Sequence, residues 1–199
     1  AVIPDSILGP CGIEYWAEVQ TLTQSLTDPI STPESDPNCL RVTVLDMVEP
    51  SVQPGESYRL LSMPLELEAP IAGIITDDLG GPDNTEWRMY AYLPEEGGYS
   101  EIPNDTIYSF EQGRGYWLIT RDDHQLDTGP AEGLSTPTDS AFALVLNPGY
   151  NLIGDPFAFD VSWDSVLVDT LSGEPLTIAE AEGVAIEPLV SWMVGQGYI

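Results

Sequence analysis

Residues 86–102, EWRMYAYLPEEGGYSEI, decide the fold class of this chain. In the first half, side chains alternate between two faces of a predicted strand, with Trp87, Met89, Ala91 and Leu93 on one face and Arg88, Tyr90 and Tyr92 on the other. PEEGG then supplies turn residues, and YSEI returns as a second short strand. The pattern predicts an antiparallel β-hairpin.

Other short strands are predicted on both sides of this hairpin. LRVTVLDMV (40–48), GYWLIT (115–120) and FALVLN (142–147) are rich in branched and aromatic residues. Helical candidates are few, because 163–171 is compatible with a short helix or a strand and 177–185 is interrupted by Gly183. We therefore expect a mainly β, sandwich-like fold with little helix.

An internal repeat divides the chain. Residues 57–81 match 149–173 at an offset of 92, and 107–117 match 189–199 at an offset of 82. Each unit opens with Tyr-x-Leu-(Leu/Ile)-small-x-Pro and closes with Gly-x-Gly-Tyr.

The repeat predicts two related β units after an N-terminal β segment. The segment covers residues 1–53 and could be the end of an immunoglobulin-like domain. The first unit covers 54–138. The second covers 139–199, is shorter and is open at its C-terminal end. We expect Tyr198 and Ile199 to begin a strand that pairs within the second unit.

The charge balance restricts the partners. There are 33 acidic residues against 5 arginines and no lysine, for a formal net charge of −28. Such a chain repels phosphates and anionic lipid surfaces, which argues against nucleic acid and against membrane surfaces as partners. No apolar run approaches the ~20 residues of a membrane helix. The charge favours a saline, extracellular or cell-surface setting, although an ordinary soluble acidic protein is the alternative.

Two cysteines, Cys11 and Cys39, flank a stretch rich in Pro, Ser, Thr and Asp. In an oxidising compartment this spacing favours one disulfide that closes a loop. Two free buried thiols are the alternative.

One acidic segment is a candidate calcium site. TDDLGGPDNTE (76–86) gathers Asp77, Asp78, Asp83 and Asn84 around two glycines. Carboxylate and amide oxygens on a flexible loop suit Ca²⁺, which is the only cofactor the sequence indicates. The spacing differs from an EF-hand loop, and Asp77 and Asp78 could instead cap a turn.

Three tyrosines on the predicted hairpin are candidates for glycan binding. Tyr90, Tyr92 and Tyr99 could form a platform on which a sugar stacks. Cross-strand packing is the competing interpretation of the same residues.

Catalytic motifs are weak. PCGIEYWAE (10–18) resembles the segment around a papain-type nucleophile, but Tyr15 stands where the cysteine would be, and His124 is the only histidine. Acidic pairs are inevitable among so many carboxylates and carry little information. We predict no catalytic residues and a protein that is not an enzyme, with a secreted hydrolase as a minor alternative.

YRLLSMP (58–64), GRGYWLIT (113–120) and PGYNLIGDPFAFDVSW (148–163) carry a resemblance to a family. They resemble tandem β modules of large secreted or surface-anchored bacterial proteins, which open with a Gly-Trp/Tyr-Asn-Leu-Ile-Ser/Gly-x-Pro motif and close with Gly-Tyr-Trp. The resemblance covers about residues 54–199 and implies an extracellular β module with no activity to carry over.

Together these observations predict a non-enzymatic extracellular structural or adhesive module. One version is a bacterial surface filament whose subunits associate through β-strand edges, and other surface protein domains are further candidate partners. A carbohydrate-binding module is the alternative.

Overall fold

The computed structural model describes residues 9–30, 37–103, 107, 109–170, 173–190, 192–193 and 197–198. The fold is mainly β, with 34% strand, 9% helix and several antiparallel sheets. The predicted fold class is therefore confirmed.

The largest sheet contains the predicted hairpin. Its four strands lie in the order β6 (Arg59–Ser62), β10 (Gly115–Thr120), β8 (Trp87–Leu93) and β9 (Gly98–Ile102), all antiparallel. The turn between β8 and β9 uses Gly97 at φ 63°, a backbone conformation that glycine adopts without strain. β6 and β10, which come from the opening and closing motifs of the first unit, are neighbours, so these motifs meet in one sheet.

A second sheet and a helix complete the layers around the core. Its strands lie in the order β5 (Thr43–Leu45), β11 (Glu132–Ser135) and β7 (Leu65–Leu67), and the helix is α1 (Ile71–Leu79). Apolar side chains from both sheets and from α1 form one buried cluster, which includes Leu65, Ile71, Met89 and Leu118, each 0% exposed. This cluster is the hydrophobic core of the described chain.

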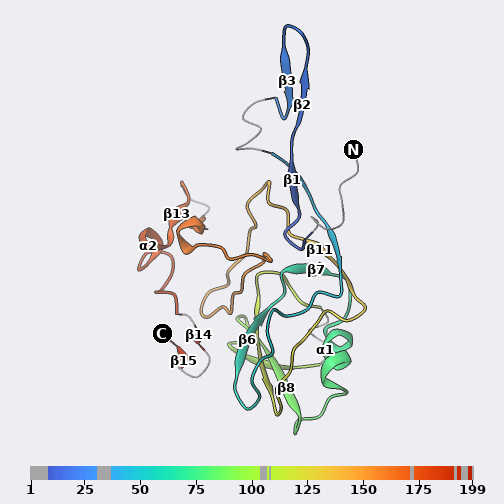
Figure 1. Ribbon diagram of the computed structural model, residues 1–199. Helices are drawn as coiled ribbons and strands as arrows, with labels where there is room; N and C mark the ends of the chain where they lie inside the picture. The colour runs from blue at the N-terminus through green and yellow to red at the C-terminus, as the bar shows by residue number, and fades with distance from the viewer. Residues whose placement is uncertain are drawn as a thin grey trace.

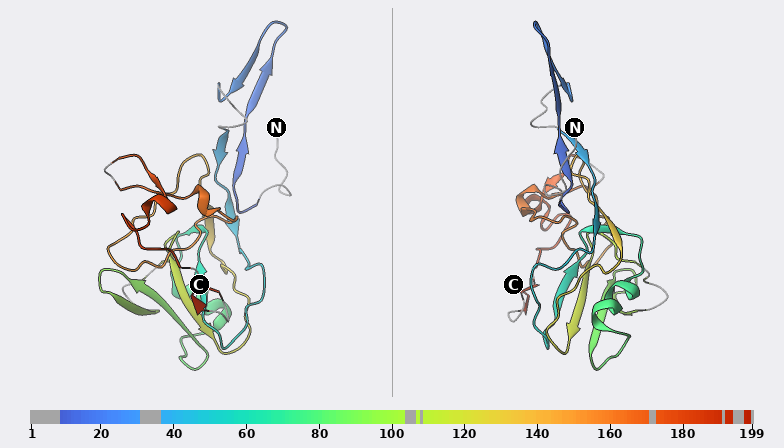
Figure 2. Two further views of the ribbon diagram at one scale, coloured as in Figure 1. Left: turned by 90° about the vertical axis from the view of Figure 1, so that its left-hand side faces the viewer. Right: turned by 45° about the vertical axis from the view of Figure 1, so that its right-hand side comes forward.

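The N-terminal segment forms a long projection. β1 (Ile13–Tyr15) pairs with β4 (Asn38–Leu40), and β2 (Ala17–Gln20) pairs with β3 (Ser25–Asp28). The hairpin of β2 and β3 extends away from the body of the molecule in every view (Figures 1 and 2). We call residues 13–28 the arm.

The second unit contains little regular structure. It includes a 3₁₀ turn at Trp163–Ser165, the strands β12 (Leu167–Val168) and β13 (Leu176–Thr177), and α2 (Ile178–Ala181). Of the residues described between 139 and 190, only Ala181 is buried. The segment that the repeat aligns with α1 begins with the 3₁₀ turn and continues into β12, so the sequence match does not extend to the same secondary structure.

The chain ends in a short hairpin, in which β14 (Trp192–Met193) pairs with β15 (Gly197–Tyr198). The register places Tyr198 opposite Trp192. The expected pairing of Tyr198 within the second unit is confirmed, and Ile199 lies outside the described residues.

Backbone hydrogen bonds join the second unit to the first at the Gly-x-Gly motif. The N–H of Gly154 donates to the carbonyl of Gly113 at 3.0 Å, and the N–H of Gly115 donates to the carbonyl of Leu152 at 3.1 Å. A Cβ on Gly113 would lie 2.9 Å from the Phe142 ring, and a Cβ on Gly154 would overlap Ser62. Gly113 of the motif and Gly154 opposite it therefore leave no room for a side chain, because the Phe142 ring and the Ser62 side chain lie against them.

Candidate functional site

The arm is the candidate functional site, because its two faces differ in chemistry. Side chains alternate along a strand, so Val19 shares one face with its cross-strand partner Leu26. These two side chains are 61% and 62% exposed. An isolated two-stranded hairpin gains little stability in water, and this one leaves its apolar face uncovered by the described chain.

The opposite face of the arm is polar and internally bonded. The Glu18 carboxylate accepts hydrogen bonds from the Gln20 side-chain amide at 2.9 Å and from the Ser25 hydroxyl at 2.5 Å. The bonds from Gln20 and Ser25 lower the pKa of Glu18 below its ordinary value. Both donors are neutral, so the negative charge of Glu18 is held in place and not neutralised.

The outer edge of β2 is open. The Thr21 N–H donates to the Gln24 carbonyl at 2.7 Å, and hydrogen-bonded pairs recur at every second residue of an antiparallel ladder. Val19 therefore bonds to Leu26, while Glu18 and Gln20 turn their backbone N–H and C=O groups away from β3. β3 is the only strand of the described chain that pairs with β2. Such an edge is a template for another strand.

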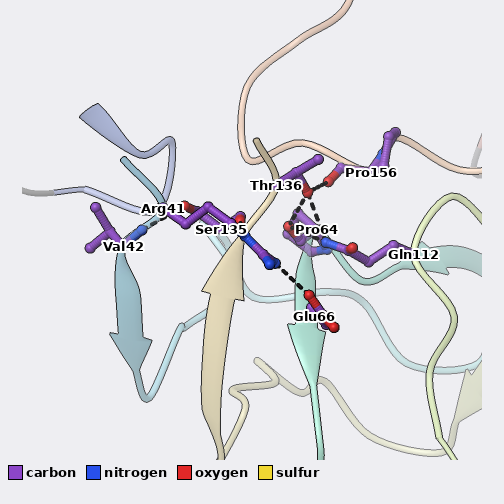
Figure 3. A network of polar contacts seen from close by, with 8 residues as sticks. All are labelled: Arg41, Val42, Pro64, Glu66, Gln112, Ser135, Thr136 and Pro156. Carbon is purple, nitrogen blue, oxygen red and sulfur yellow. Dashed lines mark hydrogen bonds and ion pairs between the residues drawn. The ribbon is translucent and has the colours of Figure 1, made fainter. Parts of the chain in front are cut away.

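Polar contacts between the base of the arm and the second sheet anchor the arm to the body (Figure 3). The Arg41 Nε donates to the Ser135 carbonyl at 2.6 Å, and its guanidinium pairs with Glu66 at 2.5 Å. The Val42 N–H donates to the Ser135 hydroxyl at 2.8 Å. Ser135 is 0% exposed, so Arg41 and Val42, which follow β4, are attached at a buried point of the body.

Thr136 connects three segments beside this anchor (Figure 3). Its hydroxyl lies 2.5 Å from the Pro156 carbonyl and 3.4 Å from the Pro64 carbonyl, and it accepts from the Gln112 side-chain amide at 2.7 Å. Thr136 is 4% exposed. Because a hydroxyl has one proton, its main donation goes to Pro156, which holds the second unit against the first.

The predicted disulfide is absent from the structure. Cys11 and Cys39 are both free. The register places Cys39 opposite Glu14, whereas Cys11 lies before β1, in a turn in which the Gly12 N–H donates to the Gly9 carbonyl. The sulfurs instead contact Ala158 and Thr138.

A shallow, open hollow lies near the base of the arm. It has a volume of about 490 Å³ and is lined by Cys11, Gly12, Glu14, Thr138 and Phe159. It holds one thiol and one carboxylate, which do not form a catalytic constellation.

The predicted calcium loop is helical in its first part. Asp77 and Asp78 belong to the last turn of α1, because Ile71, Ile74 and Ile75 bury one face of a helix there. Asp78 accepts the Asp127 N–H at 2.8 Å. The other two predicted ligands, Asp83 and Asn84, lie after the helix, and Asp83 accepts two bonds from Thr85. Among the described residues no group of three or more His, Cys, Asp or Glu is placed to hold a metal.

The three predicted glycan-binding tyrosines lie on adjacent strands and pack against neighbours. Tyr92 and Tyr99 meet edge to face at 5.1 Å and 68°, and Arg88 lies 5.2 Å above the Tyr90 ring. Arg88 also pairs with Glu101 at 2.7 Å. Tyr99 remains 55% exposed. Tyr92 and Tyr99 therefore form a cross-strand pair, whereas the cross-strand partner of Tyr90 is Glu101.

A charged group lies inside the core. Arg59 is 4% exposed, and none of its side-chain nitrogens has a hydrogen-bond partner among the described residues. Burial lowers the pKa of Arg59 and raises the pKa of the nearby Glu49, and the attraction between the two opposes both shifts. Because the attraction between Arg59 and Glu49 offsets only part of the cost of burying them, the pair lowers the stability of the fold. We do not treat it as a candidate binding site.

The arm is a candidate site that the sequence prediction missed. The alternation of IEYWAEVQ (13–20) was the available signal, since Ile13, Tyr15, Ala17 and Val19 recur at every second position. The partial likeness of the same stretch to a protease segment obscured it.

Comparison with known proteins adds no assignment. No family model, no curated protein and no solved structure matches the chain. In the part of the chain that the structure describes, none of the helices has the length and hydropathy needed to cross a membrane.

Proposed function

We propose that this protein is a non-enzymatic, extracellular structural or adhesive module that binds other protein chains by strand addition. The observation that carries the proposal is the arm, with its open β2 edge and the bare apolar face formed by Val19 and Leu26. Strand addition would convert the two-stranded ribbon into a three-stranded sheet and cover apolar surface on that face.

Secretion is supported by the charge of −28, which is tolerated best where salt screens it. It is also supported by the resemblance to tandem β modules of bacterial surface proteins. Cys11 and Cys39 are unpaired, so no disulfide adds to this support.

Amide hydrogen exchange measured by NMR tests the proposal. We expect a blocked peptide that alternates valine and serine to slow exchange at the Glu18 and Gln20 N–H groups, because an added strand would accept these bonds. Gln20→Pro removes one outward donor and should abolish the protection. Gln20→Ala keeps that donor and should preserve it. If exchange at Glu18 and Gln20 is unchanged by the peptide, strand addition to this edge is wrong.

Glycan binding is a second candidate function, favoured by the exposed Tyr99 and its contact with Tyr92. Binding on a glycan array that is lost in both Tyr90→Ala and Tyr99→Ala would support it. An array with no bound glycan would remove this candidate.

A further inference from the structure

We infer that the strand received by the outer edge of β2 belongs to a different protein and alternates apolar with basic residues. This inference rests on the proposed strand addition and specifies the partner. It follows from the charges on the arm, from the state of every arginine in the chain and from the two faces of the ribbon.

The arm carries only negative charge. Residues 9–30 contain Glu14, Glu18 and Asp28 and no lysine or arginine. The Glu18 carboxylate is fixed by neutral donors on the polar face of the ribbon, beside the open edge. A strand placed next to it brings its own side chains within cross-strand distance, where an opposite charge stabilises and a like charge destabilises.

A second copy of this chain is poorly suited to supply that opposite charge. Four arginines are already paired with carboxylates: Arg41 with Glu66, Arg88 with Glu101, Arg114 with Glu111 and Arg121 with Glu86. The fifth, Arg59, is buried in the core. Two copies would also approach with a charge of −28 each, so their association is opposed at moderate salt.

The faces of the ribbon define the order of residues in the partner strand. On one face, its side chains lie beside Val19, which forms an apolar pair with Leu26 of β3, and should be apolar. On the other, they lie beside Glu18 and Gln20 and should be lysine or arginine. The flanking Trp16, which is 50% exposed, offers an indole face that also favours a cation. Strict alternation of apolar and basic residues satisfies both faces in a single register.

The test compares short blocked peptides that differ only in the charged position. Valine alternates with lysine in the first, with serine in the second and with glutamate in the third. Affinity is measured at ~0.15 M salt, where charges more than about 8 Å apart are largely screened. We expect the lysine peptide to bind about tenfold more tightly than the serine peptide and the glutamate peptide to bind more weakly than either.

Site-specific readouts separate this binding from general attraction between a cationic peptide and an acidic protein. The lysine peptide should slow amide exchange at Glu18 and Gln20, and Gln20→Pro should remove that effect while Gln20→Ala retains it. A peptide of the same composition in which valines and lysines are grouped in blocks should not protect these amides. Glu18→Gln should reduce the advantage of lysine over serine.

The outcomes distinguish strand addition itself from the basic character of the added strand. If the serine and lysine peptides protect Glu18 and Gln20 equally, strand addition stands and the basic partner is wrong. If no peptide protects these amides, both are wrong. If sedimentation equilibrium at ~0.15 M salt shows a dimer in which the same amides are protected without peptide, the edge belongs to a second copy and this inference is overturned.

Discussion

Gly133 shows how a single residue sets the spacing between layers. It lies in the middle strand of the second sheet, and a Cβ there would be 2.7 Å from the Leu67 side chain and 2.8 Å from that of Leu65. Both leucines are core residues, with Leu65 fully buried. Glycine is therefore required at position 133 because the packed leucines leave no room for a side chain. It is not required by a turn in the backbone.

We expect Gly133→Ala to destabilise the protein by about 1–3 kcal/mol, because the added methyl group overpacks the core. Urea unfolding would measure the loss. Gly98→Ala is the matched control, since Gly98 also lies in a strand but a Cβ there would meet no atom within 4 Å. Equal losses in the two variants would contradict the packing argument.

Asp78 makes stability depend on pH. Burial and the neighbouring charges of Asp127 and Asp77 raise its pKa above the ordinary 3.8, although the Asp127 N–H opposes them. A raised pKa means that the folded state holds the proton more tightly than the unfolded chain. The contribution of this group is therefore fully present below pH 3.8 and is lost as pH rises through the folded pKa.

We therefore expect Asp78→Asn to be more stable than the parent at neutral pH, with the difference disappearing near pH 4, the ordinary range of a carboxyl group. Thermal unfolding across this range would measure it. Asp83→Asn should behave oppositely, because bonds from Thr85 lower the pKa of Asp83 and its contribution is lost as pH falls. If the difference in stability from the parent changed with pH in the same direction for both variants, the opposite pKa shifts assigned to Asp78 and Asp83 would be wrong.

At the scale of elements, the arm and the core are energetically separate. Val19 and Leu26 lie on a projecting ribbon, whereas Leu65 lies in the buried cluster. The double change Val19→Ser and Leu26→Ser should alter the free energy of unfolding of the body by less than about 0.5 kcal/mol, as exposed positions do. Leu65→Ala should cost about 2–5 kcal/mol. Urea titration followed by tryptophan fluorescence would compare them. A large loss in the double variant would mean that the arm stabilises the body.

The attachment of the second unit depends on Thr136. Thr136→Val keeps the shape of the side chain but removes the donor to the Pro156 carbonyl. We expect a loss of about 1–3 kcal/mol, since the half-buried Pro156 carbonyl and the Gln112 side-chain amide each lose a hydrogen-bond partner. Faster amide exchange at Gly154 than in the parent would locate the effect at the junction between the units. The exposed Thr85→Val serves as the control and should leave exchange at Gly154 unchanged.

The elements that the sequence predicted are those with local signals. The hairpin of β8 and β9 was predictable because alternation and turn residues lie within a single stretch. Helix α1 was missed because Pro70 precedes it, Gly73 interrupts it and three β-branched isoleucines supply its buried face. The open edge of β2 was not predictable, because it depends on which strands fail to pair with it.

The candidate site shows the same division between local and long-range information. The tyrosines of β8 and β9 were correctly placed near one another by alternation. Cys11 and Cys39 are unpaired in the structure, and the pairing of β1 with β4, which places Cys39 opposite Glu14, could not be derived from their spacing in the sequence. The calcium site stays a prediction, but two of its four residues, Asp77 and Asp78, lie in a helix whose existence depends on core burial, which the local sequence did not indicate.

At the scale of the whole molecule, charge dominates the response to solvent. With a formal charge of −28, repulsion between carboxylates opposes the compact state. We expect the melting temperature to rise between ~0.01 and ~0.5 M sodium chloride, because the Debye length falls from about 30 Å to less than 8 Å. The four arginine pairs are exposed or partly exposed and lose little when screened. A melting temperature that falls with salt would show that these pairs outweigh the general repulsion.

The projection of the arm also has an evolutionary consequence. Under the proposed strand addition, substitutions on residues 17–28 would change what the molecule binds while the buried cluster between the sheets stays as it is. Selection for a new partner and selection for folding would then act on different parts of one chain. The arm could diversify rapidly among related molecules whose bodies remain nearly alike.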